Sequence, residues 1–187
     1  MRKYLIILIL LLTFNNLSAQ TDEQIVNEIL FDLFSFQQDT ILIENIKTKT
    51  YFEYDSVSFE NMTGLTVPSQ IISEWNENEK NEDTSAVWDE LNLNKIDTLF
   101  LENDTVISKK PIFKCLSKVE IDELFEQTKK RQKIYSISKI LFDDLRENAI
   151  FRFTMIPWPG DFSSETILIK KVFGKWKIIE RFDFSMT

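Results

Sequence analysis

The chain has 187 residues, with 22 basic residues against 30 acidic ones, no histidine, one cysteine and three glycines. The lack of histidine and the single cysteine, Cys115, exclude a histidine-activated serine or cysteine nucleophile and a closed zinc site, because these need imidazole or several thiolates. The glycines stand apart at positions 64, 160 and 174, so the chain has no glycine-rich phosphate loop. Oxygen-ligand metal chemistry, carboxylate catalysis and binding remain.

The first 20 residues have the pattern of a secretory signal peptide. Arg2 and Lys3 precede an apolar run of 11 residues, 4–14, and the segment ends in small and polar residues around Ala19. A membrane-spanning helix needs about 20 apolar residues, so we expect a cleaved signal and not an anchor. Cleavage near Ala19 or Gln20 would leave no cysteine at the new N-terminus, which argues against a bacterial lipid anchor. The sequence therefore predicts an exported protein, periplasmic or extracellular, with no stable membrane anchor.

The remaining residues, 21–187, fit a single domain of ordinary size. The signal segment holds two of the 22 basic residues and none of the 30 acidic ones, so the mature chain has 20 bases against 30 acids. Such an acidic surface is repelled by phosphate backbones, and we predict no nucleic-acid partner. We also predict no cofactor and no metal.

The N-terminal part of the mature chain predicts a helix followed by strands. Thr21 and Gln24 form a capping-box pattern, and apolar residues then recur at helical spacing to about residue 36. Residues 39–45 predict a strand that runs into a turn, and residues 97–103 are a near copy of them. A duplicated half-domain and two independent strands both explain this similarity.

Residues 51–55 predict a further strand, with Glu53 and Asp55 on one face. These two carboxylates are the best candidates for acid–base catalysis, because they lie about 6.6 Å apart along an extended backbone. Glycosidase carboxylates face each other across the scissile bond, however, whereas these point the same way. We therefore predict no catalytic residue here.

The middle of the chain predicts two short helices separated by a polar segment. Pro68 and Ser69 can begin a helix, and Thr84 can begin another. Residues 74–84 are rich in glutamate and asparagine, which predicts an acidic polar linker or loop. A calcium loop is the alternative, but the segment lacks the glycine and glutamate spacing of an EF-hand.

The C-terminal half predicts one helix and a β-meander. Ser117 and Glu120 form a second capping box, with a helix to about residue 132 that buries Val119. Strands are expected over residues 134–138, 149–156 and 166–172, with a turn at 173–175 and a last strand whose inward face is formed by Trp176, Ile178, Phe182 and Phe184. Short connections favour antiparallel pairing, so the fold class is α+β: an N-terminal helix and further short helices packed on a mainly antiparallel sheet. Trp75, Trp88 and Trp176 occupy periodic apolar positions and are assigned to the core.

The loop around Trp158 is the strongest candidate for a binding site. Pro157 and Pro159 stiffen it and can present a large aromatic ring with little loss of entropy. The candidate binding residues are Trp158, Gly160, Asp161 and Phe162. The alternative is that Trp158 folds back over the edge of the sheet.

The stretches Ser138-Lys139-Ile140-Leu141-Phe142 and Gly174-Lys175-Trp176-Lys177-Ile178 carry a resemblance. With the polar turn and the strand that begins at Ala149, they resemble an uncharacterised family of small exported bacterial proteins that end in an antiparallel β-meander. The match covers about residues 97–187 and departs at Ile140, where the family has proline, and in the Trp158 loop. It implies no activity and no catalytic residues. A weaker similarity is to NTF2-like domains, which also begin with helices and end in long antiparallel strands.

Two functions remain from the sequence. The first is an exported, non-catalytic binding or interaction module for a protein partner or small ligand, through the Trp158 loop. The alternative is a carboxylate-dependent hydrolase, or an NTF2-like pocketed enzyme, acting on envelope material. Converging carboxylates in a concave pocket would favour the enzyme, and an exposed aromatic patch would favour the module.

Overall fold

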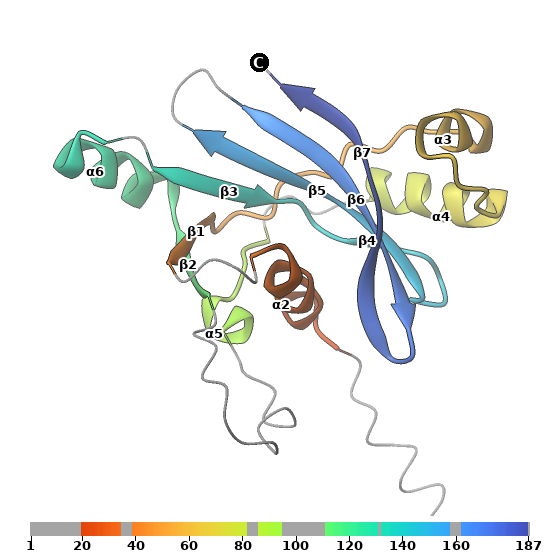
Figure 1. The fold of residues 1–187 in the computed structure, drawn as a ribbon, viewed down its shortest axis with the longest axis horizontal. Coiled ribbons are helices and arrows are strands. Elements are labelled where there is room, and N and C mark those ends of the chain that lie inside the picture. The colour runs from red at the N-terminus through yellow and green to blue at the C-terminus, as the bar shows by residue number, and fades with distance from the viewer. Residues whose placement is uncertain are drawn as a thin grey trace, which may run out of the picture.

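The fold is α+β, as predicted, and its sheet is mostly antiparallel (Figure 1). The computed structural model describes residues 20–34, 39–81, 86–94, 111–130, 132–157 and 162–186. Its elements, in chain order, are α2 (Asp22–Leu33), β1 (Thr40–Glu44), α3 (Ser56–Thr63), α4 (Ser69–Lys80), α5 (Glu90–Leu93), β2 (Ile112–Leu116), α6 (Lys118–Thr128), β3 (Lys133–Ile137), β4 (Leu141–Phe142), β5 (Asn148–Pro157), β6 (Ser163–Val172) and β7 (Lys175–Met186). The predicted strand at 97–103 lies outside the described residues.

The sheet combines a parallel edge with a long antiparallel meander. Its order is β2-β1-β3-β5-β6-β7, and β4 pairs with β5 beside β3. β1 is parallel to both β2 and β3, whereas the pairs from β3 through β7 are antiparallel. Because Ile137 pairs with Phe153 and Leu141 with Ile150, β3 and β4 lie one after the other along β5. They act as one interrupted strand.

Each face of the sheet carries its own apolar cluster. The face defined by Ala149, Phe151 and Phe153, here called the α2 face, packs against the buried side of α2, formed by Ile25, Val26, Ile29 and Leu30. The opposite face, defined by Ile150 and called the α4 face, is covered by α3, α4 and the segment before them, through Phe52, Phe59, Ile72 and Trp75. Figure 1 shows α2 below the sheet, between α5 and the β6–β7 hairpin, and α3 and α4 together on the other side of β7. Strands buried on both faces therefore form the centre of the molecule.

β7 changes its inward face along its length. Ile169 pairs with Ile178 but Leu168 pairs with Glu180, so one extra residue of β7 is inserted at this bulge. Such an insertion reverses the alternation of side chains. Trp176 and Ile178 accordingly pack on the α2 face, whereas Phe182 packs on the α4 face. The prediction that Trp176, Ile178, Phe182 and Phe184 share one inward face is wrong, and Phe184 is 66% exposed.

Three other predictions are corrected by the structure. Residues 51–55 are extended but belong to no strand, because they dock on the α4 face without a strand partner. The acidic linker or loop expected at 74–84 is helical as far as Lys80, since Trp75 and Glu79 of α4 are buried. Helix α6 buries none of its residues, and Val119 is 66% exposed. In these segments the polarity or periodicity of the sequence did not predict whether other parts of the fold cover the side chains.

The two capping boxes and the burial of three tryptophans are confirmed. Thr21 and Ser117 each accept a hydrogen bond from the backbone N–H three residues on, and Gln24 and Glu120 return the bond to the cap residue, as capping boxes do. All three tryptophans assigned to the core are buried: Trp75, Trp88 and Trp176. Local sequence therefore fixes where α2 and α6 begin.

The outer edge of β2 is closed by side chains from α5. Asn94 accepts a hydrogen bond from the Phe113 N–H (3.0 Å) and donates one to the Phe113 carbonyl (2.7 Å). Glu90 accepts another from the Cys115 N–H at 2.6 Å. Among the described residues no strand lies beyond β2, and these contacts take the place of one. Unpaired edge groups would otherwise invite pairing with another chain.

We expect Asn94→Ala to lower the free energy of unfolding by about 1–3 kcal/mol, because two backbone groups of Phe113 would lose their partners. Urea denaturation monitored by circular dichroism measures this. The matched control is Asn81→Ala, whose exposed amide donates only to the Glu77 carbonyl of its own helix. Equal losses in the two variants would contradict the edge-closing role of Asn94.

Candidate functional site

Of the four predicted binding residues, only Phe162 lies within the described part of the chain. Trp158, Gly160 and Asp161 lie outside it. Phe162 directly precedes β6 and is 37% exposed. Phe162 therefore places the end of the predicted binding segment at the start of β6.

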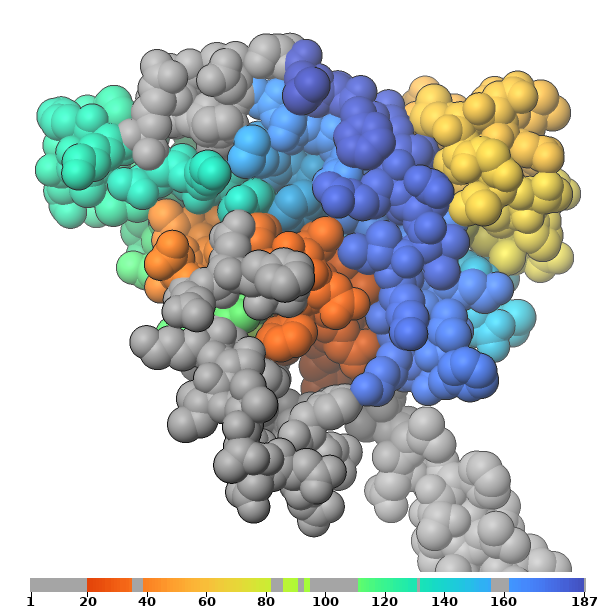
Figure 2. Space-filling model, in the orientation of Figure 1, coloured from red at the N-terminus to blue at the C-terminus, as the bar shows by residue number. Residues whose placement is uncertain are grey.

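Phe162 stands at a corner of the sheet where other apolar side chains are exposed. The strand register pairs Ser163 with Met186 on β7 and with Met155 on β5. Phe184 is 66% and Met186 83% exposed. We call Phe162, Phe184 and Met186 the apolar corner. Figure 2 shows the end of β7, in dark blue, at the surface at the top of the molecule.

The predicted carboxylate pair does not form a site. Glu53 and Asp55 are both exposed. Asp55 is the N-cap of α3 and accepts a hydrogen bond from the Ser58 N–H at 2.7 Å. Hydrogen bonds from Ser58 lower the pKa of Asp55, so its carboxylate is held in the charged, capping form. Its role is structural.

A polar cluster on the α4 face joins β5, β6 and β7. The Arg152 side chain donates to Ser164 (2.8 Å), Asp183 (2.6 Å) and Ser185 (3.3 Å). Burial raises the pKa of Tyr54, and the nearby Asp183 carboxylate adds to this effect. Because Nε and both terminal nitrogens of the guanidinium already donate to the protein, we assign Arg152 to holding the three strands together. In the sequence, this cluster is indicated only by Arg152, a charged residue on the same strand face as Ile150 and Thr154.

The turn between β4 and β5 behaves as its sequence predicts. Asp143 is only 3% exposed and accepts hydrogen bonds from the Glu147 N–H, the Asn148 N–H and the Asn148 side chain. Short polar side chains commonly close turns in this way. Asp143 therefore closes the turn through its side chain.

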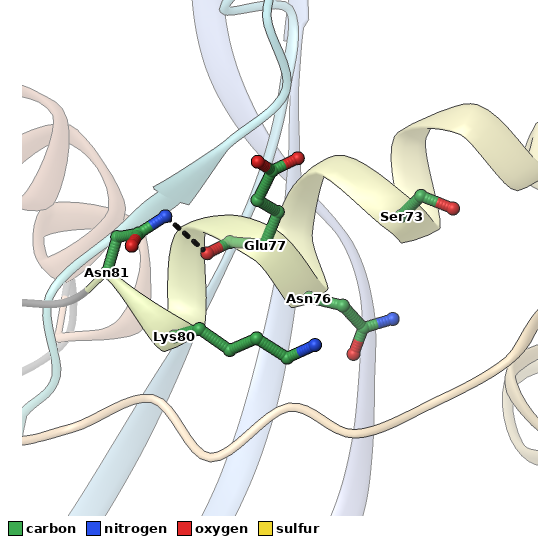
Figure 3. A pocket seen from close by; sticks show the side chains of 5 residues that line it. All are labelled: Ser73, Asn76, Glu77, Lys80 and Asn81. Atoms are coloured by element: carbon green, nitrogen blue, oxygen red, sulfur yellow. Dashed lines mark hydrogen bonds between the residues drawn. The ribbon is translucent and has the colours of Figure 1, made fainter.

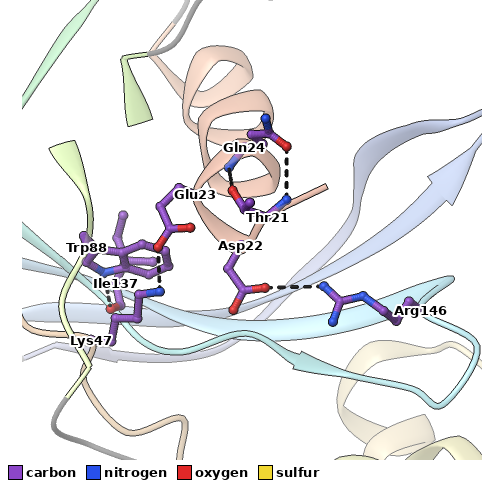
Figure 4. A network of polar contacts seen from close by, with 8 residues as sticks. All are labelled: Thr21, Asp22, Glu23, Gln24, Lys47, Trp88, Ile137 and Arg146. Atoms are coloured by element: carbon purple, nitrogen blue, oxygen red, sulfur yellow. Dashed lines mark hydrogen bonds and ion pairs between the residues drawn. The ribbon is translucent and has the colours of Figure 1, made fainter. Parts of the chain in front are cut away.

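Ion pairs attach the start of α2 to the sheet (Figure 4). The Lys47 ammonium lies 2.7 Å from Glu23 and 4.2 Å from the centroid of the Trp88 ring. The Trp88 indole donates in turn to the Ile137 carbonyl at 3.1 Å. Burial by itself raises the pKa of Glu23, but the hydrogen bond and charge of Lys47 outweigh it, so that the pKa is lowered overall. This network holds the start of α2 against the α2 face of the sheet.

A polar hollow lies along α4 (Figure 3). Its volume is about 560 Å³, and its lining comes from one stripe of the helix: Ser73, Asn76, Glu77, Lys80 and Asn81. The segment over residues 49–54 lies beside α4 but contributes no residue to this lining. It is fixed there by the Asn76 amide, which donates to the Tyr54 carbonyl at 2.7 Å, and by the Lys49–Glu79 ion pair at 2.7 Å. Sequence reasoning assigned these α4 residues to a linker and so missed the hollow.

Cys115 is half-buried beside the α2-face cluster. Burial raises the pKa of its thiol to about 12, with further contributions from the charges of Glu90 and Asp89. The thiolate is the reactive form, so this cysteine is held unreactive. Cys115 therefore serves as a small packed side chain.

The chain matches no protein-family profile, no curated protein and no solved structure. Within the described residues, no helix combines the length and apolar character needed to cross a membrane. The same part of the chain holds no group of three or more histidine, cysteine, aspartate or glutamate side chains placed to bind a metal ion.

Glu23→Gln should lower the free energy of unfolding by about 1 kcal/mol near pH 7, because it removes the charged partner of Lys47. A lowered pKa stabilises the fold above the ordinary value of 4.5, and this contribution is lost as the pH falls through the folded pKa. The difference between wild type and variant should therefore shrink below pH 4.5, as urea titrations at several pH values would show. Glu126→Gln, at an exposed ion pair, is the control. A difference that persists unchanged in acid would contradict this assignment.

The Cys115 thiol should react with Ellman's reagent at pH 8 at least about a hundredfold more slowly in the native protein than in denaturant, because its thiolate is scarce. Absorbance of the released thionitrobenzoate measures both rates. Similar rates would show that burial does not protect the thiol.

Proposed function

We propose that this protein is an exported, non-catalytic binding module that contacts a protein partner or small ligand through the apolar corner and the adjoining loop. The observation that carries this proposal is the shared exposure of Phe162, Phe184 and Met186 at one end of β6 and β7. The proposed site comprises these residues with Trp158, Gly160 and Asp161.

Exposed aromatic side chains support binding for a physical reason. Single exposed apolar residues are common on protein surfaces, but grouped ones mark interaction sites. A ring attached to a paired strand loses little freedom when a partner covers it, so more of the burial energy contributes to affinity. Ser163 and Met186 are paired in the ladder, which fixes the backbone beside Phe162. Strand pairing therefore holds the backbone at this end of β6 and β7.

The proposal includes export through residues 1–20 and a location in the periplasm or medium. It includes no nucleic-acid partner, because the chain has 30 acidic against 22 basic residues. The hydrolase alternative receives no support from the described carboxylates that suggested it. Glu53 and Asp55 are exposed, and Asp55 is occupied as a helix cap.

The test is site-specific photo-crosslinking in the native envelope. A photoreactive phenylalanine analogue is placed at Phe162, and the control carries it at Val57 on α3, which is 68% exposed. We expect a discrete crosslinked product from position 162 only. Phe184→Ala should weaken that product at least about tenfold, because truncation of a large central contact typically costs more than 1 kcal/mol.

Crosslinking that survives Phe184→Ala unchanged would remove this residue from the contact. Identical products from positions 162 and 57 would show non-specific proximity and would overturn the assignment of the corner. Circular dichroism of each variant would confirm that the fold is retained.

A further inference from the structure

We propose that the β-hairpin formed by β6 and β7 attaches the protein reversibly to an anionic lipid surface, through Phe173 at its tip and the lysines around it. We call residues 170–177 the lysine hairpin. Its turn lies between Val172 and Lys175, whereas the apolar corner lies at the other end of the two strands, so this site goes beyond the proposed function. Figure 1 shows the hairpin at the end of β6 and β7 that is remote from the C-terminus.

Phe173 occupies a position that neither turn geometry nor packing explains. The two turn residues, Phe173 and Gly174, have φ angles of 52° and 79°. Two-residue hairpin turns of this kind need positive φ at both positions and favour asparagine or glycine at the first, whereas a bulky side chain is uncommon there. The Phe173 ring is fully exposed, so no contact within the described chain compensates for this conformation. A contact outside the chain accounts for the ring.

Four lysines flank the tip, and no acidic residue lies among them in the sequence. They are Lys170, Lys171, Lys175 and Lys177, and all four are exposed. Lys170 pairs directly with Lys177 across the two strands, and like charges at directly opposed positions destabilise a sheet. The mature chain carries 20 bases against 30 acids, so the lysine hairpin has a local charge opposite to that of the whole protein. Such a conflict with folding is typical of a functional site.

The turn between β4 and β5 lies beside the base of the lysine hairpin. The Lys171 N–H donates to the Glu147 carbonyl at 2.8 Å. This turn exposes a second apolar side chain, Leu145, and it also carries the exposed acids Asp144 and Glu147. Figure 1 shows the hairpin reaching farther from the C-terminal end of the sheet than this turn does. The basic, aromatic tip therefore projects past the nearby acids.

A projecting tip fits a surface and not a small ligand. Small-molecule sites are concave and bury most of the ligand, whereas a hairpin turn presents few contacts to a compact anion. An apolar residue flanked by basic ones is typical of proteins that lie at the membrane–water interface. The Phe173 ring can enter the headgroup region while the aliphatic parts of the lysines lie beside it and their ammonium groups reach the lipid phosphates. Anionic lipid therefore matches both the apolar and the charged part of the hairpin.

The predicted signal segment ends beside the same hairpin. The Gln20 amide donates to Glu28 at 2.7 Å, and Glu28 also accepts a hydrogen bond from the Trp176 N–H at 3.1 Å. A signal segment held in a membrane during export would therefore bring the hairpin to that membrane. The 10 residues of β6 span about 30 Å of extended backbone. A protein attached through the hairpin thus holds the apolar corner away from the lipid, where a partner can reach it.

The experiment measures co-sedimentation of the mature protein with vesicles of phosphatidylglycerol and phosphatidylethanolamine, and with vesicles of phosphatidylcholine alone. We expect binding to the anionic vesicles that weakens as salt is raised, and little binding to the neutral ones. Phe173→Asn should weaken the binding at least about fivefold. It should not lower the thermal unfolding temperature, because asparagine suits this turn position better than phenylalanine. Phe173→Trp should retain the binding, since indole favours the membrane interface.

The contribution of the lysines is tested with a charge-matched pair of double variants. Lys170→Gln combined with Lys177→Gln should weaken the binding at least about tenfold, because both lysines attract the anionic lipid. The control, Lys118→Gln combined with Lys130→Gln, removes the same charge from exposed positions near the two ends of α6. Tyr51→Asn is the aromatic control, at a residue that is 66% exposed. Neither control should change vesicle binding.

No binding to anionic vesicles, equal binding by wild type and Phe173→Asn, or equal binding to neutral vesicles would overturn the lipid contact. In the native envelope, a photoreactive phenylalanine analogue at position 173 should form lipid adducts. A discrete protein product in their place would overturn the assignment of a lipid partner. None of these results affects the proposed function, because crosslinking from Phe162 concerns the opposite end of β6 and β7.

Discussion

The central strands β5 and β6 are apolar on both faces, and the arrangement of the other elements depends on covering both. Successive residues of a strand point to opposite sides, so Phe151 and Ile150 need separate partners. Helix α2 supplies one cover, and α3 with α4 supplies the other. Both covers precede the strands in the chain. The C-terminal meander is therefore a packed sheet only when residues 22–80 have docked on it.

Polar contacts decide where each cover sits, because apolar burial alone has no direction. Lys47 links the start of α2 to Trp88 and through it to β3. On the α4 face, Arg152 links three strands at the point where β7 departs from regular pairing, and Asp183 there has a φ of 54°. Aspartate tolerates this left-handed conformation better than most residues. The Lys47 contacts fix α2 relative to the sheet, and the Arg152 contacts fix β5, β6 and β7 relative to one another.

The proposed binding surface lies where the sheet ends. The apolar corner lies at the last paired residues of β6 and β7. The residues that join the layers and strands, such as Lys47 and Arg152, lie outside it.

Much of the local structure could be predicted because its causes lie within a few residues. The cap residues Thr21 and Ser117, the helical spacing of α2 and the alternation along β5 and β6 are all local signals. The sequence also selected Phe162, which is exposed at the corner. It failed at residues 51–55 and at 74–80, because the burial of Phe52 and Trp75 depends on the face of a sheet formed about 65 to 130 residues later.

The candidate sites divide in the same way. An exposed aromatic beside prolines can be recognised in a short stretch of sequence, but the Arg152 cluster joins residues far apart in the chain. The amino-acid sequence by itself determined the α+β class, the positions of the main helices and strands, and the exclusion of histidine- and thiol-based chemistry. Only the tertiary structure decided which side chains share a face, because the bulges in β7 and the docking of α4 depend on pairing and packing between distant residues, which no local pattern encodes.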